Sequence, residues 1–283
     1  MRKFSAYKKF FSLFACLFIA FNLFGCSCNC NEKKNLLGVW WWNDTLDSDY
    51  LDFAKNNGVT EIYYCSDNFN IKTASFIEKA NNLNIKVYWL AGEYKWLNDS
   101  KNLYTKIALY EKYQKEYPNK KFEGIHLDIE PHQNPNFDEN REDLILSLIQ
   151  LANDLSNDFN AIKFDYDIPF WFNDEISFDN NTKPAYAHMI DVANRVFLMS
   201  YRDSSEDIYS VSKDEIDYAT KNNKTIFLGV ETKSNEGDKV SFQEEGKKIM
   251  EEEISKVRKL IPNNFGISIH QIETWYILKE ETN

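Results

Sequence analysis

Short apolar runs recur along the chain, and polar residues, glycine or proline bound each of them. Runs of this length that are rich in β-branched and aromatic residues are typical of β-strands. Several are apolar almost throughout, as expected when both faces of a strand are covered. The eight predicted strands are Leu36–Trp42, Glu61–Ser66, Lys86–Ala91, Gly124–Glu130, Ile162–Pro169, Arg195–Tyr201, Thr225–Glu231 and Gly266–Ile272.

Segments with helical periodicity fill the intervals between these strands. Strict alternation of strands and helices predicts a parallel sheet, and eight strands predict a single (β/α)8 TIM barrel over residues 36–283. The alternative is an open doubly wound sheet, but no glycine-rich phosphate loop follows the first strand. The predicted helices are Leu46–Asn56, Thr73–Asn82, Leu103–Tyr117, Asn140–Asn157, Ala185–Ala193, Ser212–Asn222 and Phe242–Leu260.

The N-terminal residues have the pattern of an export signal. Four basic residues precede the apolar segment Phe10–Phe24, which is short for a membrane span but suits a signal peptide. It ends in Leu23-Phe24-Gly25-Cys26, which resembles the lipobox of bacterial lipoproteins. We expect residues 1–25 to be the signal peptide, Cys26 to carry the lipid and residues 26–35 to be a tether. The protein would then be a membrane-anchored lipoprotein on the outer face of the bacterial membrane, with an uncleaved N-terminal anchor as the alternative.

Charge and cysteine content restrict the classes of partner and cofactor. The formal net charge is −11, and it becomes −15 without residues 1–25 because four basic residues leave with them. A chain with this negative charge is repelled by nucleic acid and by anionic lipid headgroups, so we do not expect either as a partner. The cysteines have no spacing that would build a zinc site or a disulfide framework, and we expect no metal and no cofactor. They are Cys16, Cys26, Cys28, Cys30 and Cys65.

The fourth predicted strand carries three ionisable residues on one face. Side chains alternate along a strand, so His126, Asp128 and Glu130 share the face opposite that of the intervening isoleucine and leucine residues. That face points to the barrel axis, where ionisable groups are costly unless they are paired or used. A structural ion-pair network is the alternative. The polarity is greatest at the C-terminal end of the strand, where TIM barrels hold their active sites.

Other strands bring polar groups to the same end of the barrel. Asp165 and Asp167 share a face of strand five, where they could equally serve as partners for lysine or arginine. Tyr201 ends strand six and could be an ordinary core tyrosine. Glu231 ends strand seven, and His270 lies near the end of strand eight. Convergence of these groups favours a functional site.

Two segments resemble signatures of family 18 glycoside hydrolases, which include chitinases and endo-β-N-acetylglucosaminidases. The segment from Glu123 to Glu130 resembles the fourth-strand signature DGxDxDxE, and Met199-Ser200-Tyr201 resembles the start of the sixth-strand signature MxYD. The resemblance implies that Glu130 is the general acid, that Asp128 orients a substrate acetamido group which attacks the anomeric carbon, and that Tyr201 hydrogen-bonds this group.

The chain departs from these signatures at several positions. His126 and Arg202 each replace an aspartate, and Glu231 stands where the family usually has proline. His270 occupies the position of the tryptophan that floors the sugar subsite, and Trp275 follows five residues later as a possible substitute. Because of its position, Glu231 is also a candidate nucleophile in a two-carboxylate retaining mechanism.

The leading hypothesis is a glycosidase that cleaves an extracellular polysaccharide or glycoprotein glycan. The first alternative is a carbohydrate-binding surface lipoprotein without catalysis. The second is a metal-dependent hydrolase that uses His126, Asp128, Glu130, Glu231 and His270. The expected catalytic residues are Glu130, Asp128, Tyr201 and Glu231, and the expected substrate-binding residues are His126, Asp167, Trp171, Arg202, His270 and Trp275.

The lipoprotein hypothesis predicts that Cys26→Ala abolishes incorporation of labelled palmitate and releases or mislocalises the protein. The reason is that only Cys26 closes the apolar segment directly after a small residue. Labelling of cells followed by fractionation measures both effects, and unchanged palmitate incorporation into the variant would contradict the hypothesis.

Overall fold

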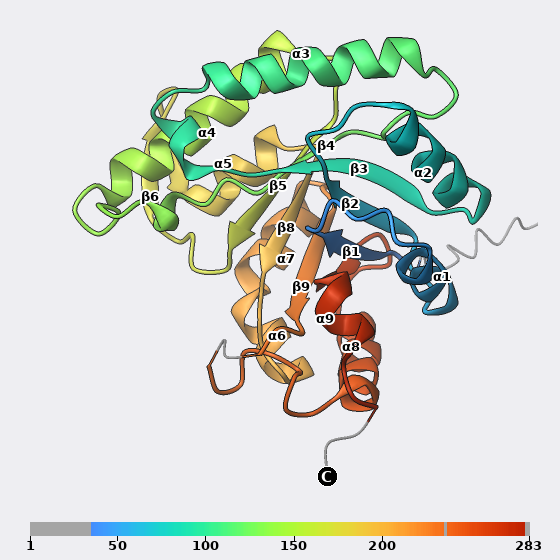
Figure 1. Ribbon diagram of the computed structural model, residues 1–283. Coiled ribbons are helices and arrows are strands. Elements are labelled where there is room, and N and C mark those ends of the chain that lie inside the picture. The colour runs from blue at the N-terminus through green and yellow to red at the C-terminus, as the bar shows by residue number, and fades with distance from the viewer. Residues whose placement is uncertain (1–34, 235–236, 281–283) are drawn as a thin grey trace, which may run out of the picture. The chain divides into compact units, whose positions relative to one another are not determined.

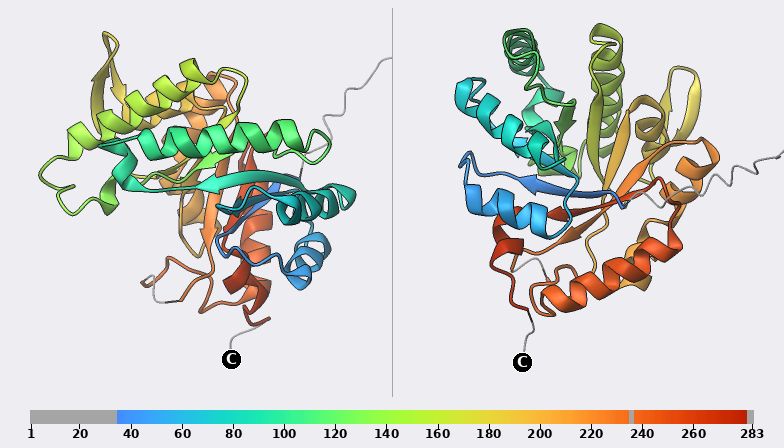
Figure 2. Two further views of the ribbon diagram at one scale, coloured as in Figure 1. Left: turned by 45° about the horizontal axis from the view of Figure 1, so that its top comes forward. Right: turned by 90° about the vertical axis from the view of Figure 1, so that its right-hand side faces the viewer.

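The computed structural model describes residues 35–234 and 237–280, so the expected signal peptide and Cys26 lie outside the described residues. Within that part of the chain, no helix has the length and apolar character needed to cross a membrane. Eight parallel strands close into a barrel in the order β1-β10-β9-β8-β5-β4-β3-β2 (Figures 1 and 2), which confirms the predicted fold. These strands are β1 (Leu37–Trp41), β2 (Glu61–Cys65), β3 (Lys86–Ala91), β4 (Ile125–Leu127), β5 (Phe164–Pro169), β8 (Arg195–Met199), β9 (Ile226–Glu231) and β10 (Gly266–His270).

Helices cover the outside of the barrel, and each of the seven predicted helices is present. The largest shift is at the last one, which begins at Lys247 instead of Phe242, directly after Gly246 with its positive φ of 87°. The helices are α1 (Ser48–Asn56), α2 (Ile71–Asn82), α3 (Lys101–Glu116), α4 (Arg141–Asp158), α5 (Ala185–Val192), α6 (Ser205–Val211), α7 (Lys213–Lys221), α8 (Lys247–Leu260) and α9 (Ile272–Tyr276), with the 3-10 helices η1 (Tyr94–Leu97) and η2 (Pro131–Gln133).

Several short elements were not predicted from the sequence. A hairpin of β6 (Glu175–Phe178) and β7 (Asn181–Pro184) follows β5, and its two turn residues, Asp179 and Asn180, both have positive φ. Strand β10 ends at His270, two residues earlier than expected. Here Gln271 caps helix α9, with reciprocal hydrogen bonds to Thr274 that end the strand.

The inside of the barrel is filled mainly by aromatic side chains rather than by branched aliphatic ones. They form a buried cluster distinct from the core between the strands and the helices. Two glycines make room for them: a Cβ at Gly38 would lie 2.0 Å from the Tyr63 hydroxyl, and a Cβ at Gly266 would lie 2.1 Å from the Phe227 ring. The buried members of this cluster are Trp40, Tyr63, Tyr88, Leu90, Phe197 and Phe227.

An ion-pair network fills the N-terminal end of the barrel interior. Arg195 donates to both carboxylate oxygens of Glu61 at 2.9 Å and to Asp165 Oδ2 at 2.6 Å. Tyr63 donates to Glu61 at 2.7 Å, and the Asn194 amide donates to Asp165 at 2.7 Å. Strand β2 lies opposite β8 in the closed order, so the Arg195 side chain spans the barrel. Of the two roles considered for Asp165, the structure shows the structural one.

The network predicts that Arg195→Met lowers the free energy of unfolding by about 3–5 kcal/mol, because two buried carboxylates lose their counter-charge. Urea denaturation measures the loss. Lys213→Met is the matched control, because it removes only a solvent-exposed ion pair with Asp217 and should cost far less than Arg195→Met. Equal losses in the two variants would contradict the proposed importance of the network.

Candidate functional site

A cavity of about 410 Å³ opens at the C-terminal end of the barrel strands. Loops and strand ends from β1, β3, β4, β9 and β10 line it, which is where TIM barrels place their chemistry. Of the residues expected in the site, Asp128, Glu130 and His270 line this cavity. The full lining is Trp42, Gly92, Glu93, Tyr94, Asp128, Glu130, Gln133, Lys233, His270 and Gln271.

Asp128 follows the last paired residue of β4, and its backbone N–H donates to Ala91 on β3 at 3.0 Å. Gly92 allows this close approach, because a Cβ there would lie 2.0 Å from the Asp128 carbonyl oxygen. The Oδ1 atom of Asp128 is buried and has no hydrogen-bond partner among the described residues. Burial raises the pKa of Asp128 well above its usual value, and the neighbouring Asp167 and Glu130 carboxyl groups raise it further. Its protonated form is therefore favoured in the folded protein.

Glu130 is held by the two residues that follow Pro131. His132 Nε2 lies 2.7 Å from Glu130 Oε2, and the Gln133 amide donates to Glu130 Oε1 at 2.7 Å. Pro131 occupies the first turn of η2, and this tight turn directs both side chains back to Glu130. Sequence reasoning missed His132 and Gln133. The signal for them is a proline directly after the strand-end glutamate, which predicts a turn rather than a continuing strand.

Trp171 supports this arrangement instead of lining the cavity. Its ring packs edge-on against His132, with 5.4 Å between the ring centroids. The guanidinium of Arg141 lies 4.7 Å from the Trp171 ring and pairs with Asp174 at 2.7 Å. Trp171, expected to bind substrate, therefore holds His132 in place.

Asp167 and His126 lie one layer deeper, beneath the cavity. The Oδ2 atom of Asp167 is 2.8 Å from His126 Nε2 and accepts from the Trp40 indole at 3.1 Å. Burial raises the pKa of Asp167 well above its usual value and lowers the pKa of His126 to about 3, so this histidine is neutral. Neither residue lines the cavity. Their contacts in this structure are those of supports for the layer above, and contact with substrate stays a prediction.

Glu231 and His270 form a second network beside the cavity. The Trp42 indole donates to His270 Nε2 at 3.0 Å, so His270 Nδ1 carries the proton that it shares with Glu231 Oε2 at 2.7 Å. The other oxygen of Glu231 accepts from the backbone N–H groups of Thr232 and Lys233 at 2.7 and 2.8 Å. Glu231 is 2% exposed and does not line the cavity. Its contacts indicate that it positions His270, which in turn accepts the hydrogen bond from Trp42.

Tyr201 lies beside His270 and, like Glu231, is not part of the cavity lining. Its ring centroid is 5.8 Å from that of His270, and a Cβ at Gly229 would lie 3.1 Å from its ring. Burial raises the pKa of Tyr201 well above its usual value, and carboxylates at Glu231, Asp167, Asp128 and Glu130 raise it further. Its hydroxyl is therefore protonated and able to donate a hydrogen bond within the carboxyl cluster.

Two further residues expected to bind substrate also lie outside the cavity lining. Arg202 lies 4.6 Å from the Phe170 ring and donates to the Tyr201 carbonyl oxygen at 2.7 Å. Trp275 is 2% exposed and packs against Phe53 in the core, because α9 turns the chain away from the cavity after His270. The tryptophan that lines the cavity is Trp42, which sequence reasoning overlooked although it shares the inward parity of Trp40.

The ligand set of the metal-dependent alternative is not assembled. In residues 35–234 and 237–280, no three His, Cys, Asp or Glu side chains are grouped so that they could hold a metal ion. His126 is enclosed beneath the cavity, and both ring nitrogens of His270 have protein partners.

Comparison with known proteins supports the fold and no more. No protein-family model matches the chain, and no curated protein sequence matches it. It is similar in structure to a chitinase from Bacteroides thetaiotaomicron, with a TM-score of 0.53 and 14% identity over 85% of this chain and 90% of that one. It is also similar to a chitinase from Rhizomucor miehei, with a TM-score of 0.50 and 12% identity over 85% of this chain and 95% of that one. A protein assigned as a deoxyribose-phosphate aldolase from Toxoplasma gondii has a TM-score of 0.51 and 11% identity over 86% of this chain and 89% of that one. Because the barrel is shared by proteins assigned to different reactions, it does not define the reaction.

The raised pKa of Asp128 predicts that Asp128→Asn becomes more stable relative to the wild type as pH rises above about 4, the ordinary pKa of an aspartate. A raised pKa in the folded state means that the folded protein binds more protons than the unfolded chain, so the wild type loses stability with rising pH. The uncharged amide removes this loss. Thermal unfolding across this pH range measures the difference.

Asp174→Asn is the matched control with the opposite sign. Hydrogen bonds from Arg141 lower the pKa of Asp174, so its ionised form stabilises the fold. This variant should be less stable than the wild type at neutral pH, and the difference should shrink in acid. A constant effect of Asp128→Asn over the whole pH range would contradict the burial of a neutral carboxyl group.

Proposed function

We propose that this protein is a glycosidase that cleaves glycans containing 2-acetamido sugars, with Glu130 as general acid. One observation carries the proposal: the cavity at the C-terminal end of the barrel holds Asp128 and Glu130 on one face of the chain, two residues apart, in two different environments. Asp128 has one buried, unpartnered oxygen, whereas both oxygens of Glu130 are held by side chains. Paired carboxyl groups with different environments are the usual basis for acid and orienting roles.

In the proposed reaction the acetamido oxygen of the bound sugar attacks the anomeric carbon while the glycosidic bond breaks. Glu130 transfers its proton to the departing oxygen, and water later opens the cyclic intermediate. Asp128 orients the acetamido group from the cavity, and the Tyr201 hydroxyl, outside the cavity lining, assists it. His132 and Gln133 fix the direction of Glu130, and Trp42 offers an apolar surface to the sugar ring.

The contacts of Glu231 favour this substrate-assisted route over direct attack by Glu231. Each oxygen of that carboxylate is already bonded, one to His270 and the other to two backbone N–H groups. The alternative of carbohydrate binding without catalysis retains the same cavity and differs only in turnover. We further propose that lipidation of Cys26 displays the barrel outside the cell, where polysaccharides and glycoprotein glycans are the accessible substrates.

The proposal is tested by screening the purified protein against chromogenic glycosides and polymeric glycans. Glu130→Gln should reduce turnover at least about a hundredfold, the low end for a general acid, while binding persists. The activity should be confined to acetamido sugars, and Asp128→Ala should abolish it. Trp171→Ala removes the packing behind His132 and leaves Glu130 itself unchanged, so it is the milder comparison.

Two results would overturn the mechanism. Near wild-type turnover of Glu130→Gln would exclude that residue as the acid. Hydrolysis of glycosides that lack an acetamido group, abolished by Glu231→Ala and restored by azide, would show that Glu231 is the nucleophile. Binding of glycans without turnover of any would favour the non-catalytic alternative.

A further inference from the structure

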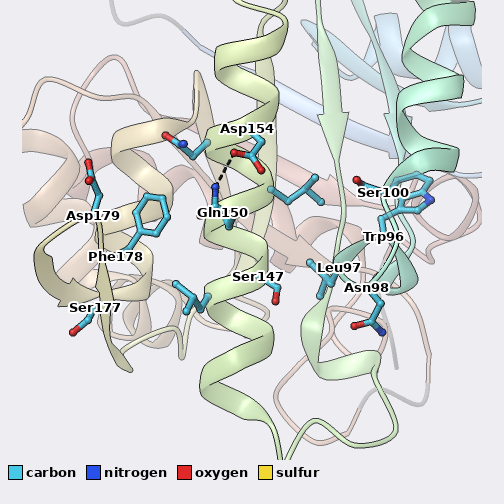
Figure 3. Close-up of a pocket in the computed structure, with 13 residues that line it drawn as sticks. Trp96, Leu97, Asn98, Ser100, Ser147, Gln150, Asp154, Ser177, Phe178 and Asp179 are labelled. Carbon is cyan, nitrogen blue, oxygen red and sulfur yellow. Dashed lines mark hydrogen bonds between the residues drawn. The ribbon is translucent and has the colours of Figure 1, made fainter.

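A second cavity, of about 810 Å³, lies outside the barrel along helix α4. Figure 3 shows α4 as its floor, with the β6–β7 hairpin on one side and the segment from η1 to the start of α3 on the other. The floor residues Ser147, Gln150 and Asp154 recur at intervals of three and four, so they lie on one face of the helix. We call this cavity the α4 groove.

The side chains of the α4 groove offer hydrogen bonds with little charge. The groove contains amides, hydroxyls and two carboxylates, Asp154 and Asp179, but no lysine or arginine. Phosphate or sulfate groups would therefore meet no counter-charge. Among the side chains drawn in Figure 3, only Gln150 and Asp154 are hydrogen-bonded to each other, at 2.7 Å. The complete lining is Trp96, Leu97, Asn98, Ser100, Leu146, Ser147, Gln150, Leu151, Asn153, Asp154, Ser177, Phe178 and Asp179.

Apolar side chains on both walls complete a surface suited to sugar rings. Phe178 projects from the hairpin and Leu97 from η1, on opposite sides of the polar floor. Sugars present hydroxyls at their edges and C–H groups on their faces. A polar floor with an apolar side chain on each wall matches that chemistry, and it matches neither an apolar helix nor a polyanion.

The α4 groove adjoins the site already described, because η1 contributes to both. Tyr94 at the start of η1 lines the cavity of Asp128 and Glu130, and Leu97 at its end lines the α4 groove. A polymer bound across the cavity can therefore continue over η1 along α4. A single short sugar would occupy only one of the two.

We propose that the α4 groove binds a distal segment of the glycan whose cleaved bond lies at Glu130. The protein then acts within long chains rather than only at their ends. This inference rests on the proposed glycosidase function, and it adds a subsite remote from the reacting bond.

The test compares a polymer with a small substrate. Gln150→Ala/Asn153→Ala should raise KM for glycol chitin about tenfold, as expected for the loss of two hydrogen bonds, and leave hydrolysis of 4-methylumbelliferyl N-acetylglucosaminide unchanged. Ser147→Trp, which fills the floor, should have the same selective effect. Asn157→Ala is the matched control, because Asn157 is exposed on the same helix one turn beyond Asn153 and does not line the groove.

Binding is measured separately, by retardation of Glu130→Gln in gels that contain glycol chitin. Retardation that Ser147→Trp weakens would support the groove even if the protein hydrolyses nothing, in which case only the proposed function fails. Hydrolysis of glycol chitin with the groove variants indistinguishable from Asn157→Ala would overturn the groove and leave the function standing. Absence of both hydrolysis and retardation would overturn both.

Discussion

The architecture depends on one interaction, the bridging of Glu61 and Asp165 by Arg195 across the barrel interior. A barrel of this size must fill its interior, and this chain does so with large aromatic and polar side chains that bring charges with them. The arginine satisfies two carboxylates on opposite sides and fixes where β2, β5 and β8 stand relative to one another. The Trp40–Asp167 contact repeats this device one layer higher, from β1 to β5. Each layer therefore supports the layer above it.

The buried carboxyl groups at the two ends of the barrel differ in how many hydrogen-bond partners they have. At the N-terminal end, Glu61 and Asp165 have full complements of donors. At the C-terminal end, Asp128 and Asp167 each retain a buried oxygen without a partner among the described residues. An unpaired buried acceptor costs free energy unless a ligand or water supplies the missing partner. Asp128 lines the cavity, where a ligand can reach its free oxygen, whereas Asp167 lies beneath the cavity and supports it through His126 and Trp40.

Sequence periodicity predicted all eight strands, because strands covered on both faces leave a continuous apolar pattern. Strand alternation likewise placed Asp128 and Glu130 on the inward face. The prediction failed where the chain leaves regular structure. His132 reaches Glu130 through the turn at Pro131, and Trp275 enters the core because α9 begins directly after Gln271. Such turns depend on caps and tertiary contacts, which strand alternation does not encode.

The glycines inside the barrel also limit how such a chain can evolve. Tyr63 occupies the space that a side chain at position 38 would need, and Phe227 occupies the space that one at position 266 would need. Any larger residue at either glycine requires a smaller one on the neighbouring strand at the same time. Among related sequences, a larger residue at position 38 should therefore occur together with a smaller one at position 63. The same should hold for positions 266 and 227. Diversification of this barrel then proceeds by paired changes inside and by free variation in the loops that surround its cavity.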